Sequence, residues 1–397
     1  MVTKKSVPNV YMRDEKLDSI NIIKVVLCFV VTQQLHYHQH FLTGFVKHTS
    51  YLYQPYLDYI LKHSNPMGEL IFMMSGVFFA VAYRNRIIGG KSTFGDFMVK
   101  RFIRIWPMVM IALTYLYFIQ FRVYDLMGYC YSWTGTTNIW VYLGDLLYVR
   151  GFWMGTAEFG TMPMNGSTWQ LYILMVCYAV AFILCQIEGY IQKKKPGAKT
   201  IWIHAIPIVI GTVLFLLKLN LPALTENWAR GYSFFIGIYV YELMKWSNGL
   251  NKKKRYILLA ATAVLYVGVM LAGDTMWDLW GINESLVYTY VASPALMLFL
   301  YNSSLAVKIG QWKPVAYLGD LTFDLFTWNF PIMGTFYYLI NAGVIRLYGY
   351  EIPVWILMWL THLVVASLSH ELIEKRLGNW IQKKWSLRGI KKRSAYD

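Results

Sequence analysis

Long apolar runs separated by short polar segments constrain this 397-residue chain more than any other feature of its sequence. Backbone N–H and C=O groups inside a lipid bilayer have no water to bond, so a run that crosses the bilayer must be helical. A spanning helix needs about 20 apolar residues. Ten runs approach that length, and they predict an all-α polytopic membrane bundle of about ten transmembrane helices: 20–42, 68–83, 102–120, 168–187, 201–217, 230–244, 256–272, 285–301, 317–341 and 353–372.

The basic residues are distributed as membrane topology requires. If the N-terminus is cytoplasmic, 29 of the 37 Lys and Arg residues fall in six cytoplasmic segments: 1–19, 84–104, 188–200, 245–255, 302–314 and 373–397. Loops rich in Lys and Arg face the cytoplasm. Both termini are therefore predicted to be cytoplasmic. Topology also accounts for the net charge of +16 without a nucleic-acid partner. We expect a multi-pass protein of the cell membrane. A bacterial cytoplasmic membrane is a separate expectation, which the charge pattern does not itself indicate.

The predicted organisation is a cytoplasmic segment over 1–19, a transmembrane domain over 20–372 and a basic tail over 373–397. The external segment 121–167 is rich in Tyr, Trp and Gly, and it is interpreted as either a re-entrant or an interfacial segment. The segment is expected either to be a loop that faces a substrate or to be an ordinary loop at the membrane surface. The tail, with its spaced Trp, Leu and Ile, is either a surface helix on anionic lipid or a solvated cytoplasmic end.

Cysteine and histidine usage gives no metal or disulfide framework. Three of the four cysteines lie in apolar runs, and only Cys130 lies in a predicted external segment. His36 and His40 in the sequence HYHQH stand four residues apart, which suits a pair of metal ligands on one helix face. Because no clear third ligand lies nearby, no metal is predicted.

The strongest local signal is FGDFMVKRFIRIWPM at 94–108. It places Lys100, Arg101 and Arg104 at the cytoplasmic mouth of the third apolar run, with Arg101 and Arg104 on one helix face. Two guanidinium groups suit a phosphate-bearing cytoplasmic ligand. The alternative is that these charges only anchor the helix at the membrane surface.

Four stretches in order resemble the acyltransferase 3 family, the ten-helix membrane O-acyltransferases of cell-envelope sugars. The segment 94–108 looks like the family's Arg-x-x-Arg signature, and GELIFMMSGVFFA at 68–80 is similar to its acidic residue, aromatic run and Ser-Gly. STWQLYILMVCY, which contains Trp169, resembles its Trp-x-Leu helix, and LGDLTFDLFTWNFPI at 318–332 resembles its late helix. The resemblance covers the chain from residue 17 to the last run.

The resemblance implies transfer of an acyl group, expected to be acetyl, from cytoplasmic acetyl-CoA or another acyl-CoA. The acceptor would be a hydroxyl of an envelope polysaccharide or lipid-linked sugar, and no tightly bound cofactor is implied. Lys100, Arg101 and Arg104 would hold the donor. The chain departs from the family pattern where catalytic histidines are usual, because Thr32 and Asn329 stand at those positions.

His36 lies one helical turn beyond Thr32 on the same face, so it is the candidate base for deprotonating the acceptor hydroxyl. Glu69, in the place of the usual Asp, would orient the imidazole, and Asn329 would donate to the developing oxyanion. An interfacial histidine and a helix N-terminal carboxylate are the alternatives for the first two. The remaining candidates, assigned to the substrate tunnel, are Thr32, Trp169, Lys24 and Asp324; for Lys24 and Asp324, mutual pairing or snorkelling is the alternative.

A non-enzymatic transporter of glycans or lipid-linked sugars on the same scaffold is the alternative function, because the family histidines are replaced. An unrelated transporter is a third hypothesis. It is disfavoured because matching halves with Gly- or Pro-broken helices are absent from the sequence.

A cysteine introduced at position 390 is expected to react with a membrane-impermeant maleimide only after the membrane is permeabilised, because the tail is predicted to be cytoplasmic. The four native cysteines are first replaced. A cysteine in place of Arg346, in a predicted external segment, is the matched control and reacts in intact cells. Reaction at position 390 in intact cells would overturn the topology.

Overall fold

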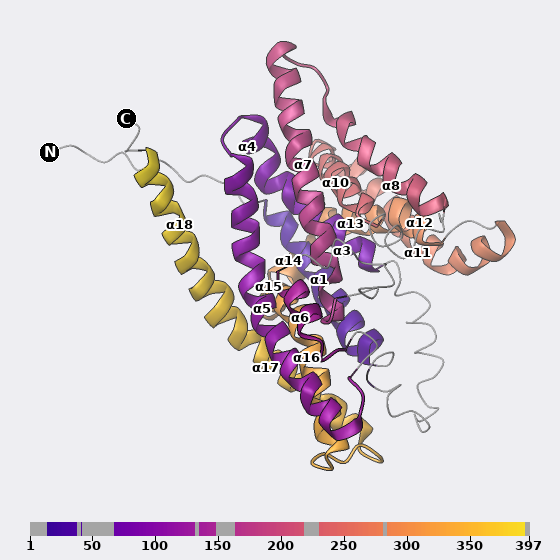
Figure 1. Ribbon diagram of the computed structural model, residues 1–397. Coiled ribbons are helices and arrows are strands. Elements are labelled where there is room, and N and C mark those ends of the chain that lie inside the picture. Colours follow the sequence, from indigo (N-terminus) through magenta and orange to yellow (C-terminus); the bar gives the residue numbers. More distant parts are fainter. Residues whose placement is uncertain are drawn as a thin grey trace.

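The computed structural model describes residues 14–37, 41, 67–131, 135–147, 163–217, 230–280 and 284–393. These residues form helices and connecting turns, with no strand among them (Figure 1). His40 and most of the connecting part of the segment 121–167, namely 132–134 and 148–162, lie outside the described residues. The interpretations placed on them stay predictions.

The first half of the chain contains short helices and long ones in alternation. Its elements are η1 (Glu15–Ser19), α1 (Ile20–Cys28), η2 (Phe29–Leu35), α3 (Met67–Phe79), η6 (Ala80–Arg84), α4 (Asn85–Ile88), α5 (Phe94–Met127), α6 (Ile139–Leu146), η8 (Gly166–Thr168) and α7 (Trp169–Lys194).

The second half adds the helices that close the bundle. They are η9 (Ile201–His204), α8 (Ala205–Leu217), α10 (Tyr232–Asn248), α11 (Lys252–Trp280), α12 (Glu284–Val287), η10 (Tyr288–Ala292), α13 (Ser293–Asn302), α14 (Ser304–Gln311), α15 (Lys313–Asp320), α16 (Thr322–Asn341), α17 (Glu351–Ser369), η11 (His370–Leu377) and α18 (Gly378–Arg393).

Every apolar run predicted from the sequence is helical over most of its described length, so the all-α architecture is confirmed. Five helical segments of the described chain are long and apolar enough to cross a bilayer alone. A sixth candidate joins η10 and α13 to α14, with a bend of 82° between α13 and α14. The number ten and the cytoplasmic placement of the two ends stay predictions.

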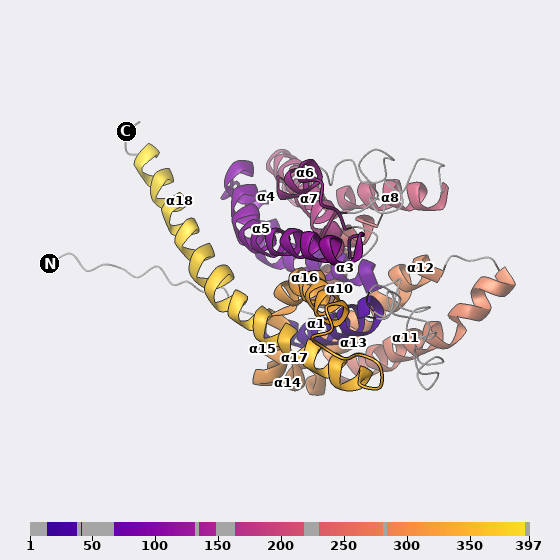
Figure 2. The ribbon, with the colours of Figure 1, turned by 60° about the horizontal axis from the view of Figure 1, so that its bottom comes forward.

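The helices run between two ends of the bundle. The turn between α4 and α5 and the turn that follows α7 lie at the same end, at the top of Figure 1. The turn between α16 and α17 lies at the opposite end. From a second direction, α18 extends away from the other helices as a continuation of α17 and η11 (Figure 2). The top of Figure 1 is thus the end that the charge pattern predicts to be cytoplasmic.

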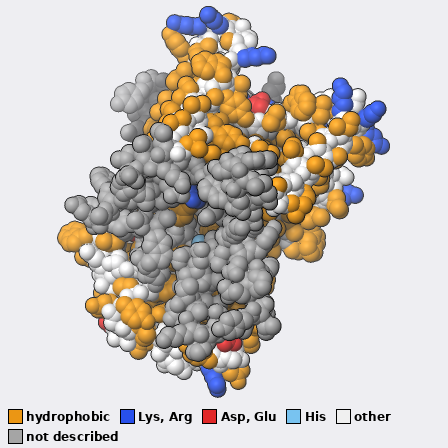
Figure 3. Space-filling view, turned by 90° about the vertical axis from the view of Figure 1, so that its right-hand side faces the viewer, with side chains coloured by type: hydrophobic (Ala, Val, Ile, Leu, Met, Phe, Trp, Pro, Cys, Tyr) orange, Lys and Arg blue, Asp and Glu red, His pale blue; other side chains and the backbone are white. Residues whose placement is uncertain are grey.

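The outer surface of the described chain is strongly apolar. Phe118 of α5, Val264 of α11 and Leu271 of α11 are 64%, 71% and 78% exposed. In Figure 3, hydrophobic side chains cover much of the described surface, and most of the visible Lys and Arg side chains gather at its upper and right-hand edges. Soluble monomers rarely expose apolar patches of this extent, so the surface fits a lipid environment.

Helix α5 carries the Arg-x-x-Arg pair, and its ends are set by local chemistry. Thr93 precedes it in an extended conformation and accepts a hydrogen bond from the amide of Asp96, which satisfies one free N–H of the first turn. Gly128 ends the helix with φ of 75°, a left-handed conformation that a glycine adopts without steric cost. The pair therefore lies about two turns inside a defined helix start.

Helices α3 and α10 pack so closely that their backbones touch. A Cβ atom at position 76 would lie 1.8 Å from the carbonyl oxygen of Phe234, and one at position 237 would lie 2.0 Å from that of Met73. Only glycine permits this distance at either position. Small residues allow membrane helices to approach closely and gain packing energy where apolar burial contributes little.

Gly76→Ala is expected to lower the free energy of unfolding by about 1–3 kcal/mol, because the added methyl group forces two backbones apart. The measurement is denaturant unfolding in detergent micelles. Gly268→Ala in α11 is the control: nothing lies near the added Cβ, and alanine gains about 0.5–1 kcal/mol in a helix interior. Equal effects of the two changes would contradict the crossing.

Candidate functional site

A cavity of about 450 Å³ lies within the bundle and is lined by α1, α3, η6, α5, α7 and α16, with residues 167 and 319–320 beside them. Three basic side chains contribute to one part of its wall: Lys24, Arg101 and Arg104. Polar groups without formal charge line another part: Ser167, Gln170 and Thr327. Tyr178 lies against Arg101 and follows Ser167 by eleven residues. That separation corresponds to about 16 Å along a helix.

Arg101 lies in an aromatic enclosure. Its guanidinium carbon is 4.0 Å from the ring centroid of Tyr83, 5.4 Å from that of Tyr178 and 5.5 Å from that of Phe97. Stacking on ring faces compensates the loss of water without occupying the guanidinium N–H donors. Among the described residues, its Nε has no hydrogen-bond partner. Arg101 is thus held in place while keeping donors for an anion.

Arg104 is positioned differently from Arg101, although both line the cavity. Its side chain is 60% exposed, and its Nε donates to the carboxylate of Glu374 at 3.2 Å. The other Glu374 oxygen lies 3.0 Å from the imidazole Nδ1 of His370, which also lies 3.0 Å from the carboxylate of Asp324. Arg104 therefore links the cavity to a cluster on α16 and η11.

The other predicted donor-side residues separate into two environments. Lys24 lines the cavity, donates to Asn21 and lies 4.8 Å from the ring centroid of Phe78. Lys100 is exposed on α5. The structure therefore brings Lys24 together with the two arginines, and it places Asp324 against His370 and Glu374.

The polar wall of the cavity is fixed to the turn before α7. Asn165 donates to the backbone carbonyl of Thr327 at 2.8 Å, and a Cβ atom at position 166 would lie 2.8 Å from the ring of Phe330. This turn and the middle of α16 therefore lie in direct contact. Asn329 is two residues further along α16 from Thr327, so the turn also fixes the helix segment that carries it.

His36 and Asn329 lie together, although 293 residues separate them in the sequence. The amide of Asn329 is within hydrogen-bonding distance of the His36 Nδ1, and the ring of Phe330 packs edge-on against the imidazole at 5.4 Å. Asn329 is almost fully buried. Thr32 is buried too, and its hydroxyl donates to the carbonyl of Cys28 at 2.7 Å.

Glu69 is fully buried at the start of α3, where its carboxylate lies 3.6 Å from Nε of Arg230. Trp169, at the start of α7, packs edge-on against Phe72 at 6.0 Å. A buried carboxylate is costly unless a positive charge compensates it. The contact with Arg230 supplies that charge, and the two predicted residues Glu69 and Trp169 both stand at the ends of helices on this side of the bundle.

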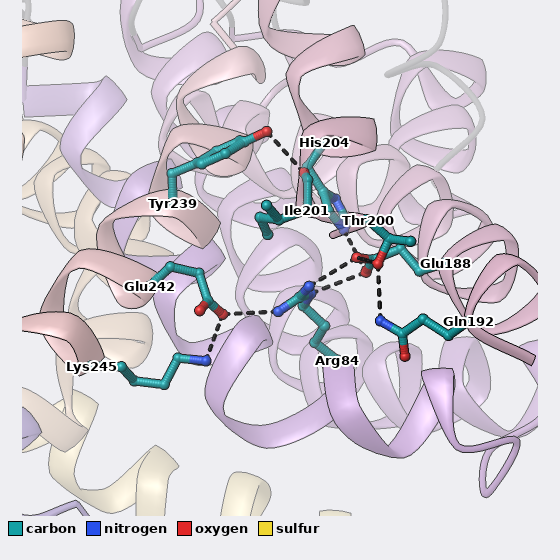
Figure 4. A network of polar contacts seen from close by, with 9 residues as sticks. All are labelled: Arg84, Glu188, Gln192, Thr200, Ile201, His204, Tyr239, Glu242 and Lys245. Carbon is teal, nitrogen blue, oxygen red and sulfur yellow. Dashed lines mark hydrogen bonds and ion pairs between the residues drawn. The ribbon is translucent and has the colours of Figure 1, made fainter. Parts of the chain in front are cut away.

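A second charged network was not anticipated from the sequence. Arg84 donates to both oxygens of Glu188, at 2.8 and 3.0 Å, and to Glu242 at 2.8 Å (Figure 4). Thr200 and His204 contact the same Glu188 carboxylate at 2.9 and 3.0 Å. The network joins η6, α7, η9 and α10. A glutamate at the edge of an apolar run, as Glu188 directly follows the run 168–187, is the sequence signal that indicates such a site.

The fold and the cavity together indicate a helical integral membrane protein with a basic cavity inside its bundle. The family model described as an acyltransferase domain matches residues 17–369, nearly the whole chain. The chain therefore belongs to the acyltransferase 3 family, which places it among the membrane acyltransferases. No curated protein and no solved structure matches the chain.

Arg84→Met is expected to lower the free energy of unfolding by about 3–5 kcal/mol, because it leaves Glu188 buried without a countercharge. Arg86→Met, in the exposed part of α4, is the matched control and is expected to change it by less than about 1 kcal/mol. Unfolding in micelles measures both. Similar values for the two variants would contradict the bidentate network.

Proposed function

We propose that the protein transfers an acetyl or other acyl group from cytoplasmic acyl-CoA to a hydroxyl of an envelope polysaccharide or lipid-linked sugar. The observation that carries the proposal is the cavity with Arg101 and Arg104 in one part of its wall and Ser167, Gln170 and Thr327 in another. Membership of the acyltransferase 3 family supports the reaction type.

The charges in the cavity suit an anionic donor. Arginine binds phosphate through two parallel N–H donors, and the stacking of Arg101 on Tyr83 leaves its N–H edge available. The acyl end of the donor is less polar than its nucleotide end. It would therefore lie between the aromatic side chains of the cavity, with Ser167, Gln170 and Thr327 near the thioester and its neighbouring amides.

The pair His36 and Asn329 suits general base catalysis. The amide oxygen and nitrogen of an asparagine are interchangeable in assignment. With the oxygen towards His36, Asn329 would accept a hydrogen bond from Nδ1–H and fix the tautomer in which Nε2 takes a proton, as in Cys-His-Asn triads. Asn329 then orients the base, whereas the sequence predicted that it donates to an oxyanion.

The reaction balances with these groups. His36 Nε2 takes the proton of the acceptor hydroxyl, the hydroxyl oxygen forms a bond with the thioester carbon, and the carbon–sulfur bond breaks. The imidazolium then returns the proton to the departing thiolate, which leaves as CoA. Glu69 pairs with Arg230 at the start of α3, so its buried charge is compensated there.

The test uses the purified protein in liposomes with radiolabelled acetyl-CoA, and undecaprenyl-diphospho-N-acetylglucosamine as the probe acceptor. The double variant Arg101→Ala, Arg104→Ala is expected to weaken acetyl-CoA binding by at least about tenfold, the loss of one or more charge-assisted hydrogen bonds. His36→Ala is expected to bind acetyl-CoA but to slow CoA release by about 100-fold or more.

Lys100→Ala is the matched control. The sequence grouped Lys100 with the donor-binding residues, but it is exposed on the same helix and does not line the cavity, so this variant should bind acetyl-CoA as the wild type does. Unchanged affinity in the double arginine variant would contradict the donor site. Normal CoA release by His36→Ala would contradict the base. Binding of the lipid-linked sugar, with its movement across the liposome membrane and without acyl transfer, would favour the transporter.

A further inference from the structure

Asp324, His370 and Glu374 form a compact cluster beside the cavity. Asp324 lies on α16, and His370 and Glu374 lie four residues apart on one face of η11. One atom from each residue, a carboxylate oxygen or an imidazole nitrogen, lies within 4.8 Å of those of the other two. The hydrogen bonds of η11 follow the wider π-helical pattern, which occurs frequently at functional sites.

The cluster holds more acceptors than donors. Nδ1 of His370 lies 3.0 Å from one oxygen of Asp324 and 3.0 Å from one oxygen of Glu374. This nitrogen carries at most one hydrogen, so it serves two carboxylates incompletely. The second oxygen of Asp324, a fully buried residue, has no hydrogen-bond partner among the described residues. Such a buried acceptor costs stability unless a donor or a cation meets it.

A second group of three potential metal ligands behaves in the opposite way. Cys185, Glu188 and His204 also lie within reach of one ion. There the guanidinium of Arg84 binds both oxygens of Glu188, and Thr200 and His204 add further donors. The chain itself supplies donors to both oxygens of Glu188. Of the two groups, only the cluster at Asp324 therefore keeps a carboxylate oxygen without a donor among the described residues.

We propose that Asp324, His370 and Glu374 bind a divalent transition-metal ion such as Zn²⁺. Imidazole and carboxylate are ordinary zinc ligands at about 2.0–2.2 Å, and ligand atoms that surround one tetrahedral zinc ion at that distance stand about 3.3–3.6 Å apart. The two spacings of 3.0 Å around Nδ1 are a few tenths of an ångström shorter, so small side-chain movements would admit the ion. Arg104 binds the remaining oxygen of Glu374 and orients this ligand from outside.

The ion would join α16 to η11 next to the basic wall of the cavity. Two carboxylates would cancel the charge of a divalent ion, and the neutral imidazole adds none. The charge of Arg104 would then stay uncompensated beside the cavity while its Nε donates to Glu374. The sequence signal is His370-x-x-x-Glu374, a spacing that places two ligands on one helical face. The third ligand comes from α16, so the spacing alone does not reveal it.

The test is the zinc content of untagged protein in detergent, measured by elemental analysis after incubation with Zn²⁺ and exhaustive dialysis. Wild type is expected to retain about one zinc ion per chain, as structural zinc sites do. Asp324→Asn and His370→Gln should lose it. Glu371→Gln is the matched control, because Glu371 is exposed on the same helix and pairs with Lys375, and it should retain the ion.

Thermal unfolding separates loss of the ion from loss of the fold. Removing zinc with a chelator should lower the unfolding midpoint of the wild type and of Glu371→Gln, and should leave Asp324→Asn unchanged. A wild type that retains no zinc after dialysis, while folded, would reduce the cluster to an ion pair and overturn the proposal. Equal zinc in Asp324→Asn and Glu371→Gln would mean adventitious metal and would overturn it as well.

Discussion

The contact between α3 and α10 is the constraint on which the rest of the structure depends. Gly76 and Gly237 let two backbones meet, and in lipid such packing replaces the apolar burial that drives soluble folds. Helix α3 and its continuation η6 then carry groups with distinct tasks along their length. Glu69 lies against Arg230 at one end, Phe78 and Tyr83 line the cavity, and Arg84 closes a charged network at the other.

Buried charge is handled in two ways within one molecule. Around Arg84 the chain supplies a donor for each oxygen of Glu188, so the network is complete in itself. Around Asp324 acceptors outnumber donors, and around Arg101 aromatic rings provide compensation without hydrogen bonds. Complete networks stabilise a fold. Incomplete ones are where a membrane protein can receive a donor phosphate or a metal ion, and both lie beside the same cavity.

The sequence predicted the helices well, because long apolar runs in a membrane have one backbone solution. It also placed Arg101 and Arg104 on one helix face, and both side chains line the same cavity from α5. It did not predict that segment 302–314, expected only to be cytoplasmic, contains α14, which is bent by 82° from α13. Nor did it predict that Asn329 meets His36 or that His370 meets Asp324, because such contacts depend on how distant helices pack and leave no local periodicity.

The network of Arg84 has a mechanical consequence for the cavity. It ties η6, α7, η9 and α10 together with short ionic contacts, so the wall that carries Tyr83 and Tyr178 is stiff. The wall formed by α16 is held by fewer ionic contacts: Asp324 lies against His370 of η11, and Asn165 donates to the carbonyl of Thr327. A ligand that widens the cavity would therefore meet less resistance from α16 and the C-terminal helices than from the half that Arg84 ties together.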